Sequence, residues 1–455
     1  MNTKTLRQKI LDLAIHGKLV AQDPNDEPAS VLLEHIKAEK ERLIKEGKIK
    51  GSKKSAKASD TPHYEQVKLE VPNSWYMVSV SDLFLLNPKS ELDDNMKVGF
   101  IPMALVEDGF SGNHFYEERT WKDVKKGYCH FQNGDIGIAK ISPCFENRKS
   151  TIFKNLPNTY GAGTTELVIL RPIKVYTKFY LYLFKSDWYV KEGTKYFKGV
   201  VGQQRVHKEI FTDLHIPLPP FAEQQRIVEE IEYWFALIDQ IEQSKAALQA
   251  TIAQAKKKIL DLAIHGKLVA QDPDDEPASE LLKRINPQAE QMYKEELPKG
   301  WVITPMNILC SLVDGEKQSG IERINLDVKY LRGDRRAKKT LSSGKYVAAN
   351  SLLILVDGEN SGEVFRTPIE GYQGSTLKQL FVNANMNIEY VLQVINLHRK
   401  ELRENKVGSA IPHLNKKLFK EIEVPLPPLA EQKRIVKKIE ELFGVLDTIQ
   451  QELGE

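Results

Sequence analysis

The stretch KILDLAIHGKLVAQDPNDEPAS at residues 9–30 returns almost unchanged as KILDLAIHGKLVAQDPDDEPAS at residues 258–279. The two copies differ at one position, which is Asn25 in the first and Asp274 in the second. A second repeat pairs PLPPFAEQQRIVEEIE at residues 217–232 with PLPPLAEQKRIVKKIE at residues 425–440. These periods are far longer than the roughly 20–50 residues of a solenoid repeat. The sequence therefore predicts two large, unlike modules carried on a duplicated frame.

A weaker echo joins two short segments that each end in tryptophan. Val71-Pro-Asn-Ser-Trp75 in the first half of the chain corresponds to Leu297-Pro-Lys-Gly-Trp301 in the second half. The order of motifs is thus the same in both halves, with a different segment between them.

The frame is predicted to be helical. After Pro219 and Pro220, apolar residues recur at alternating steps of four and three, which is typical of a long helix that supercoils against a partner. Proline is tolerated near a helix start, and Gly266 is a typical residue after a helix end. We therefore predict a helix over residues 222–265. Its expected seam is Ile227, Ile231, Trp234, Ile238, Ile241, Leu248, Ile252 and Ile259.

The second copy of this helix is split between the two ends of the chain. Its first half is matched by Ile435, Ile439, Leu442 and Leu446. Its last part is matched by Leu6, Ile10 and Leu13. Equivalent helices related by an approximate two-fold axis run antiparallel, so the central helix is expected to form an antiparallel coiled coil with the split one. The alternative is an ordinary buried helix within one domain.

Between the frame segments, the sequence is typical of mixed α/β domains. Short strand-like runs at 134–139, 166–170 and 351–356 are bounded by Gly, Asn and Asp, and helical stretches follow at 178–196 and 388–404. The predicted fold class is two α/β (α+β) domains joined by long helices, in a pseudo-two-fold and circularly arranged repeat. The expected boundaries are 1–50 for an N-terminal helical segment, 51–64 for a basic linker, 65–218 for the first α/β domain, 219–296 for the central helical region, 297–425 for the second α/β domain and 426–455 for the C-terminal helix.

Length and composition narrow the class of protein. With 455 residues, 41% of them hydrophobic and 28% charged, the chain has apolar material for more than one core. No apolar run approaches the ~20 residues of a membrane helix, and the N-terminus has no apolar signal core. Three cysteines are too few for a disulfide framework, so a soluble cytoplasmic protein is expected. The net charge of +3 neither requires nor excludes a nucleic-acid partner, and the Lys-rich linker either stays solvated or contacts phosphates.

Signatures of catalysis are missing from the sequence. The Gly-Lys pairs lack the remainder of a phosphate-binding loop. In Leu218-Pro-Pro-Phe221, leucine occupies the place of the Asn or Asp that an amino-methyltransferase uses to hold its target amine. No histidines and cysteines follow a zinc-binding spacing. We therefore predict neither catalytic nor metal-binding residues in this chain.

Polar loops follow the predicted strands of both domains. Their side chains are of the types that hydrogen-bond base edges and phosphates, although each loop alone is also typical of ordinary solvated surface. The candidate DNA contacts of the first domain are Lys140, Asn147, Arg148, Lys149, Thr164, Thr165, Gln203, Gln204 and Arg205. Those of the second domain are Arg332, Arg335, Arg336, Lys338, Asn360, Ser375, Thr376 and Lys378.

Together, these motifs resemble the specificity subunit of a type I restriction–modification system. The resemblance rests on the two PLPPxAEQ elements at 217–224 and 425–432, each followed shortly by Arg-Ile-Val, and on the helix end KILDLAIHGKLV. It covers essentially the whole chain. It implies a non-catalytic DNA reader with two target recognition domains, assembled with two modification subunits and, in the full complex, with restriction subunits. It also implies that S-adenosylmethionine, ATP and Mg are held by those partners, and that this chain holds no cofactor.

The resemblance implies a division of labour within the chain. Each target recognition domain is expected to read one half of a bipartite, asymmetric DNA site, and the coiled coil to set the gap. Two near-identical frame surfaces should bind two copies of one partner, although a recent duplication alone also explains the near-identity. The candidate partner contacts are Gln22, Asp23, Asp26, Glu27, Gln271, Asp272, Asp275 and Glu276. A different class of function, a coiled-coil scaffold with two protein-binding heads and no DNA contact, remains an alternative at this point.

Overall fold

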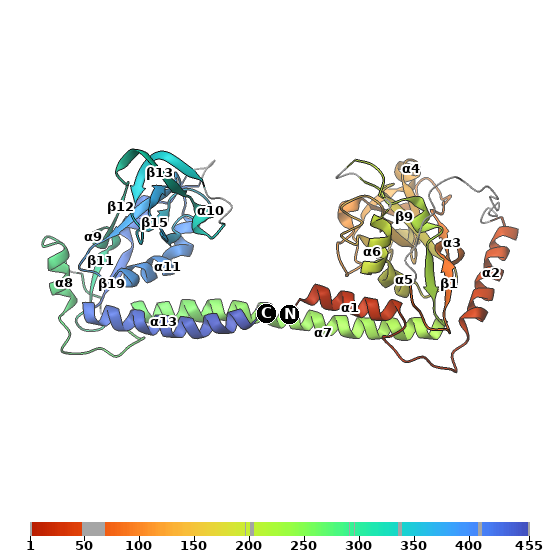
Figure 1. Ribbon diagram of the computed structural model, residues 1–455, viewed down its shortest axis with the longest axis horizontal. Coiled ribbons are helices and arrows are strands. Elements are labelled where there is room, and N and C mark those ends of the chain that lie inside the picture. Colours follow the sequence, from red (N-terminus) through yellow and green to blue (C-terminus); the bar gives the residue numbers. More distant parts are fainter. Residues whose placement is uncertain are drawn as a thin grey trace. The chain divides into compact units, whose positions relative to one another are not determined.

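The computed structural model describes residues 2–47, 69–195, 197–200, 204–290, 292–294, 296–334, 339–407 and 412–453. The chain divides into two compact units, 2–243 and 244–455. Each unit contains one α/β domain and a share of the frame helices (Figure 1). Part of the sequence predictions lies outside the described residues, namely the basic linker at 51–64 and the candidates Gln203, Arg335, Arg336 and Lys338.

The central frame helix, α7, spans Phe221–Ile264, where the sequence predicted a helix over 222–265. It begins directly after Pro219 and Pro220, at the point where a missing backbone N–H costs least. Gly266 follows the helix with a φ of 65°, a left-handed conformation that glycine adopts without strain. The helix therefore starts and stops where the backbone chemistry of its sequence predicts.

In the first unit, α1 (Thr3–Ile15) lies alongside the first half of α7 (Figure 1). Arg7, near the start of α1, pairs with Glu242 at 3.0 Å. Gln22, beyond the end of α1, bonds to Glu223 at the start of α7. The two helices therefore run antiparallel, as predicted.

In the second unit, α13 (Leu429–Glu452) lies alongside the last part of α7 (Figure 1). Lys256 pairs with Asp447, and Gln271, beyond the end of α7, bonds to Glu431 at 2.9 Å. This pairing is also antiparallel. Each half of the long helix thus has the partner predicted for it, one from each end of the chain. Shorter helices follow the repeated KILDLAIHGKLV motif in the two units, α2 (Ala29–Lys45) and α8 (Ala278–Ile285).

The seam of α7 departs from the strict heptad prediction. Its most buried large side chains are Ile227, Ile231, Phe235, Ile238, Ile252 and Leu260. After Ile231 the next buried position comes four residues later rather than three, because a straight α-helix repeats every 3.6 residues and not every 3.5. The seam predictions for Trp234, Ile241 and Leu248 are therefore wrong, since these side chains are 41%, 45% and 39% exposed.

The remaining seam predictions agree better with the structure. Ile435 and Ile439 of α13 are fully buried. Ile259 is partly buried against the core of the second unit, and Leu442 and Leu446 are half-buried. Burial is thus strongest where the frame helices contact an α/β domain.

The first α/β domain is closed by β1 (Tyr76–Ser79) and β10 (His215–Leu218), which pair antiparallel and bring its two ends together. One four-stranded sheet has the order β2 (Phe84–Leu86), β9 (Leu167–Pro172), β6 (Ile136–Ala139) and β7 (Ser150–Ile152). The other has the order β4 (Glu117–Thr120), β3 (Lys97–Ile101), β8 (Tyr160–Gly163) and β5 (Cys129–Gln132). The helices of this domain are α3 (Val80–Leu83), α4 (Trp121–Val124), α5 (Thr177–Phe184) and α6 (Asp187–Thr194).

The second α/β domain repeats this plan, with a small barrel in place of the second four-stranded sheet. It is closed by β11 (Val302–Pro305) and β19 (Glu423–Leu426). A four-stranded sheet has the order β12 (Cys310–Val313), β18 (Leu377–Val382), β15 (Leu352–Leu355) and β16 (Val364–Arg366). A small closed barrel is formed by β13 (Lys317–Leu326), β14 (Thr340–Val347) and β17 (Gly371–Gln373). The helices are α9 (Met306–Leu309), α10 (Val328–Leu331), α11 (Ile388–Glu404) and α12 (Lys416–Glu421).

The predicted strands and one predicted helix are confirmed by β6, β9, β15 and α11. The helical stretch predicted at 178–196 is confirmed in part, because it consists of two helices, α5 and α6, with Lys185 and Ser186 between them. Lys185 is the C-cap of the first helix, and Ser186 is the N-cap of the second. Its hydroxyl accepts a hydrogen bond from the backbone N–H of Tyr189 at 3.2 Å, a typical N-cap.

In each unit, one hydrophobic core joins the α/β domain to the frame helices. The core of the first unit includes Leu11, Leu32, Trp75, Tyr180, Ile216 and Ile231. That of the second includes Ala263, Leu281, Trp301, Tyr390, Val424 and Ile435. Because these clusters mix frame and domain residues, each domain is packed firmly on its helices. Within the described residues, no helix is long and apolar enough to cross a membrane.

Candidate nucleic-acid interface and repeated frame contacts

Three predicted polar loops of the first domain meet at one place. The backbone N–H of Lys140, after β6, donates to the carbonyl of Glu166, before β9, at 2.9 Å. The N–H of Ser142 donates to the carbonyl of Gln204 at 2.9 Å, and the N–H of Val206 donates to the carbonyl of Lys140 at 2.8 Å. These bonds bring together five of the predicted DNA contacts, namely Lys140, Thr164, Thr165, Gln204 and Arg205.

Arg205 is the exposed cation at this junction. Its guanidinium donates to both carboxylate oxygens of Glu166, at 2.7 to 3.2 Å, while its side chain stays 49% exposed. The hydrogen bonds raise the pKa of Arg205 and lower the pKa of Glu166. A charged fork held by a carboxylate, with half of its surface free, has the geometry that suits a guanine edge or a phosphate.

The second domain has the same three-loop junction. The N–H of Val356, after β15, donates to the carbonyl of Thr376, before β18, at 2.9 Å. The N–H of Leu414 donates to the carbonyl of Val356 at 2.7 Å. His413 corresponds to Arg205. Arg205 forms a β-bridge with Ile141, in the loop after β6, and His413 forms one with Asp357, in the loop after β15.

His413 is a candidate that sequence reasoning missed. Its Nδ1 lies 2.7 Å from the carboxylate of Asp357, and its side chain is 49% exposed, as that of Arg205 is. The signal that identifies it is its spacing. Arg205 lies 12 positions before Pro217, and His413 lies 12 positions before Pro425, the first prolines of the two repeated motifs.

Two predicted DNA contacts of the first domain are corrected by the structure. The side chains of Arg148 and Lys149 are only 10% and 16% exposed. Arg148 donates from Nε to the carbonyl of Lys185 and pairs with Asp187, whereas Lys149 donates to the carbonyl of Val106 at 2.8 Å. Their donors are used inside the domain, and neither is kept as a DNA contact. Asn147, between them and Lys140, is exposed.

The other candidates of the second domain lie around the barrel strands and the junction. Arg332 and Lys378 each pair with a carboxylate, of Glu363 and Asp314 respectively. Asn360 lies in the loop after β15, while Ser375 and Thr376 form the turn before β18. Ser375 and Lys378 also line a hollow of about 530 Å³ beside Asp314. Because Lys345 and Lys378 both bond to Asp314, the pKa of this carboxyl is held well below its usual range.

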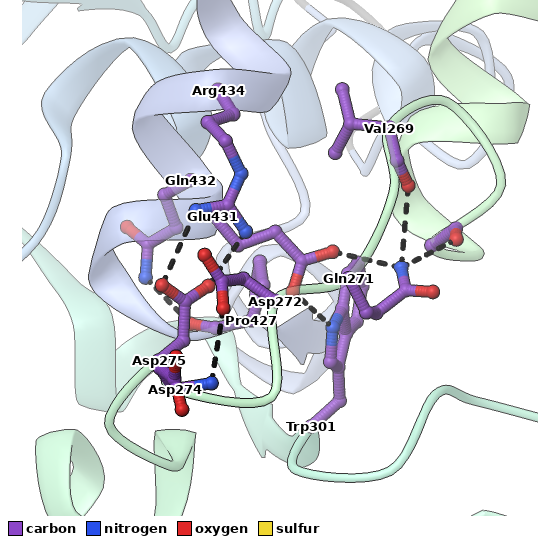
Figure 2. A network of polar contacts seen from close by, with 11 residues as sticks. Val269, Gln271, Asp272, Asp274, Asp275, Trp301, Pro427, Glu431, Gln432 and Arg434 are labelled. Atoms are coloured by element: carbon purple, nitrogen blue, oxygen red, sulfur yellow. Dashed lines mark hydrogen bonds and ion pairs between the residues drawn. The ribbon is translucent and has the colours of Figure 1, made fainter.

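The repeated frame motifs form a polar network that is drawn for the second unit in Figure 2. Glu431, from the AEQ element, accepts a hydrogen bond from the indole Nε1 of Trp301 at 2.9 Å and another from Gln271 at 2.9 Å. Arg434 forms a bidentate pair with Asp275, at 2.6 and 3.2 Å. The residues that differ least between the repeats thus bind one another.

The first unit has the same network with equivalent residues. Glu223 accepts from the indole Nε1 of Trp75 at 3.0 Å and also bonds to Gln22. Arg226 forms a bidentate pair with Asp26, at 2.6 and 2.9 Å, which lowers the pKa of Asp26. Burial raises the pKa of Glu223, against the opposing effect of its hydrogen bonds.

These contacts divide the eight predicted partner contacts into two groups. The first group is engaged within the chain and consists of Gln22, Asp26, Gln271, Asp275 and Glu276, the last of which pairs with Arg284. The second group presents exposed carboxylates and consists of Asp23, Glu27 and Asp272. Only the second group stays a candidate for partner binding in its own right.

Among the described residues, no three His, Cys, Asp or Glu side chains gather as a metal site would require. Cys129 and Cys310 are buried, and burial raises the pKa of each thiol to about 12. A thiol with so high a pKa is not a nucleophile at neutral pH.

Comparison with known proteins identifies the family. The model of the type I restriction modification DNA specificity domain matches residues 72–250 and 324–455. The specificity subunit of the type I restriction enzyme EcoAI, from Escherichia coli, is 32% identical, and the match covers 97% of this chain and 89% of that protein. The EcoEI specificity subunit, also from E. coli, is 32% identical over 99% of this chain and 90% of its own length.

Solved structures share the fold at lower sequence identity. A chain from the structure described as "Structural basis underlying complex assembly and conformational transition of the type I R-M system" aligns with a TM-score of 0.61 and 17% identity. It covers 84% of this chain and 93% of that one. The HsdS subunit of Thermoanaerobacter tengcongensis aligns with a TM-score of 0.50 and 17% identity, over 85% and 93% of the two chains. The family match and the two E. coli relatives support the DNA-specificity interpretation and not the scaffold alternative. The chain belongs to the family of type I restriction–modification specificity subunits.

Proposed function

We propose that this non-catalytic subunit gives its complex DNA specificity by reading one half-site with each α/β domain. The observation that carries the proposal is the repeated three-loop junction. Both domains present, at the same place, an exposed nitrogen-bearing side chain bonded to a carboxylate, Arg205 with Glu166 and His413 with Asp357. Because the loop sequences differ between the domains, the two half-sites are expected to differ, which makes the DNA site asymmetric.

The frame supports a second part of the proposal, the docking of two modification subunits. The same polar network occurs in both units, so the chain presents two equivalent surfaces for two copies of one partner. The exposed carboxylates of Asp23 and Asp272 stand at equivalent positions on them. The single helix α7, 44 residues long, joins the two units and is proposed to set the gap between the half-sites.

The chemistry of the complex is assigned to the partners. S-adenosylmethionine is proposed to bind the modification subunits that methylate adenine, and ATP and Mg the restriction subunits. This chain is proposed to hold no cofactor and to act in the cytoplasm, where the DNA lies. The missing amine-holding residue at Leu218 supports this assignment.

A map of methylated adenine tests the proposal. The map is made in cells that carry this gene and its modification partner, and again in cells that lack only this gene. The expected result is a split, asymmetric motif that disappears with the gene. An assembled complex that methylates no such motif would contradict the proposal.

A further inference from the structure

A buried lysine stands at the break between α5 and α6. Lys185 is fully buried, and its Nζ donates to the carbonyl of Gly109 at 2.7 Å and to the carbonyl of Arg148 at 2.9 Å. These carbonyls belong to two different loops of the first domain. Burial, together with the smaller effect of the positive charge on Arg148, lowers the pKa of this amine to about 7.

The backbone of the same turn is held by the frame. The carbonyl of Lys185 accepts a hydrogen bond from the side-chain amide of Gln8, in α1, at 3.1 Å. The N–H of Asp187 donates back to the amide oxygen of Gln8 at 2.8 Å. One glutamine of the frame thus satisfies two backbone groups at the turn, on either side of Ser186.

Arg148 completes the connection to the loop that follows β6. Its Nε donates to the carbonyl of Lys185 at 3.0 Å, and its guanidinium pairs with Asp187. Its own backbone has a φ of 59°, an unusual conformation for a residue with a Cβ, which the hydrogen bond from Lys185 to its carbonyl helps to hold. The loop 140–149 is therefore fixed at both its backbone and its side chain.

The loop held in this way is the one that carries the DNA-contact candidates. Lys140 begins it and joins the junction of Glu166 and Arg205 through backbone bonds. Its far end is held by Lys185, and the N–H of Gly109 donates to the carbonyl of Asn147 at 2.8 Å. A rigid path of hydrogen bonds thus leads from α1 to the recognition loop.

The second unit has an apolar residue at the equivalent position. Tyr180 and Tyr390 donate their hydroxyls to the carbonyls of Pro217 and Pro425, which places α5 and α11 in correspondence. Five residues later the first domain has Lys185 and the second has Ile395, which is fully buried and has no side-chain donor. The connection is a property of the first domain rather than of the repeated frame.

We propose that Lys185 is a positioning residue that ties the recognition loop of the first domain to the frame and thereby controls the reading of one half-site. The proposal rests on the function proposed above. A buried amine with two carbonyl partners in two loops costs desolvation free energy that an apolar residue avoids. In return, the two hydrogen bonds of Lys185 keep the loop in position.

The test uses the assembled complex of this chain with its modification subunits. Binding is measured to three DNA duplexes, one with the intact site and two with a single altered half-site each. The variants are Lys185→Met and the matched control Ile395→Met, which place the same side chain at equivalent positions. The ratio of affinities for intact and altered DNA gives the discrimination at each half-site.

For Lys185→Met, discrimination at one half-site is expected to fall about 10-fold, the equivalent of about 1.4 kcal/mol, while the other changes less than about 2-fold. In Ile395→Met, discrimination at the half-site that Lys185→Met affects is expected to equal that of the wild type. Equal loss at both half-sites, or no loss at either, would overturn the proposal. If the wild-type complex binds all three duplexes equally well, the proposed DNA-reading function, on which this proposal rests, is refuted instead.

A second variant keeps the test decisive if Lys185→Met does not fold. Gln8→Ala removes the two hydrogen bonds from α1 and leaves the buried lysine in place. It is expected to weaken discrimination at the same half-site, by a smaller factor, with a melting temperature within a few degrees of the wild type. Unchanged discrimination in a folded Gln8→Ala complex would contradict the proposed path from the frame.

Discussion

The indole nitrogen of Trp301 donates a hydrogen bond to the carboxylate of Glu431 at 2.9 Å, although 130 positions separate the two residues. Trp75 and Glu223 repeat this contact in the first unit, at 3.0 Å across 148 positions. The tryptophan that ends the weaker sequence echo and the glutamate of the AEQ element are thus two ends of one interaction. The near-identity of the repeats has a cause inside each unit, apart from any partner that binds there.

Glu431→Ala is expected to destabilise the second unit. The indole N–H of Trp301 would lose its acceptor in a buried site, which costs about 1–3 kcal/mol of unfolding free energy. Denaturant unfolding measures the effect, with Glu440→Ala, an exposed glutamate of the same helix, as the matched control. If the two variants are equally stable, the tryptophan–glutamate contact does not hold the frame to the domain.

The corrected seam of α7 makes a sharp prediction about two isoleucines three residues apart. Ile238 is 1% exposed and Ile241 is 45% exposed. Truncation of a buried isoleucine to alanine costs about 2–5 kcal/mol, so Ile238→Ala should lower the melting temperature clearly. Ile241→Ala should change stability by less than about 0.5 kcal/mol, as exposed substitutions do. A larger destabilisation by Ile241→Ala would support the strict heptad seam, in which Ile241 is buried.

Lys185 predicts a pH dependence of stability. Its folded pKa of about 7 lies below the ordinary value of 10.5, so between these values the unfolded chain holds a proton that the folded chain has released. The free energy of unfolding therefore rises with pH across that window, by at most about 1.4 kcal/mol per pH unit, and this group adds no slope below it.

Comparison with Lys185→Met isolates this contribution, because all other titrating groups are common to both proteins. Unfolding free energies are measured from pH 7 to pH 9.5. As pH rises, the unfolding free energy of the wild type is expected to increase relative to that of the variant. Parallel curves would mean that Lys185 keeps its proton in the folded protein.

Arg205→Ala and His413→Ala are each expected to weaken specific DNA binding by the assembled complex. If the side chain reads a base, its removal costs about 1–3 kcal/mol of binding free energy and relaxes one position of one half-site. If Arg205 binds a phosphate instead, its removal lowers the salt dependence of binding by about one unit of log–log slope.

The matched control for Arg205 is Arg119→Ala. Arg119 also pairs with a carboxylate, that of Glu117, but it lies on β4 and not on the three-loop junction. A decrease in affinity in the control as large as in Arg205→Ala would show that general positive charge, rather than the junction, decides binding. Unchanged affinity and salt slope in Arg205→Ala would remove that residue from the interface.

The parts of the fold that depend on local chemistry are predictable from the sequence. The ends of α7 follow from Pro220 and Gly266, and the strands β6 and β15 follow from short apolar runs between turn residues. The seam prediction for Trp234 is wrong because heptad counting assumes a supercoil along the whole helix, whereas Phe235 packs against the first domain. The break at Lys185 escapes prediction because its cause, a buried amine bonded to distant loops, has no local signature.

The candidate site is predictable only in part. Loop composition selects Lys140, Gln204 and Arg205, which the structure brings together because each loop follows or precedes a paired strand. Composition alone does not separate exposed cations from those that bond inside the domain, so it selects Arg148 as well as Arg205. His413 escapes prediction because a histidine and an arginine become comparable only once the two junctions are aligned.

Exchange of one domain tests the central claim most directly. Residues 76–218, from β1 to β10, are replaced by the corresponding domain of another specificity subunit, and the methylated-adenine motif is mapped in cells. If each domain reads its own half-site, one half of the motif changes and the other half stays as it was. A change in both halves, or in neither, would contradict the account.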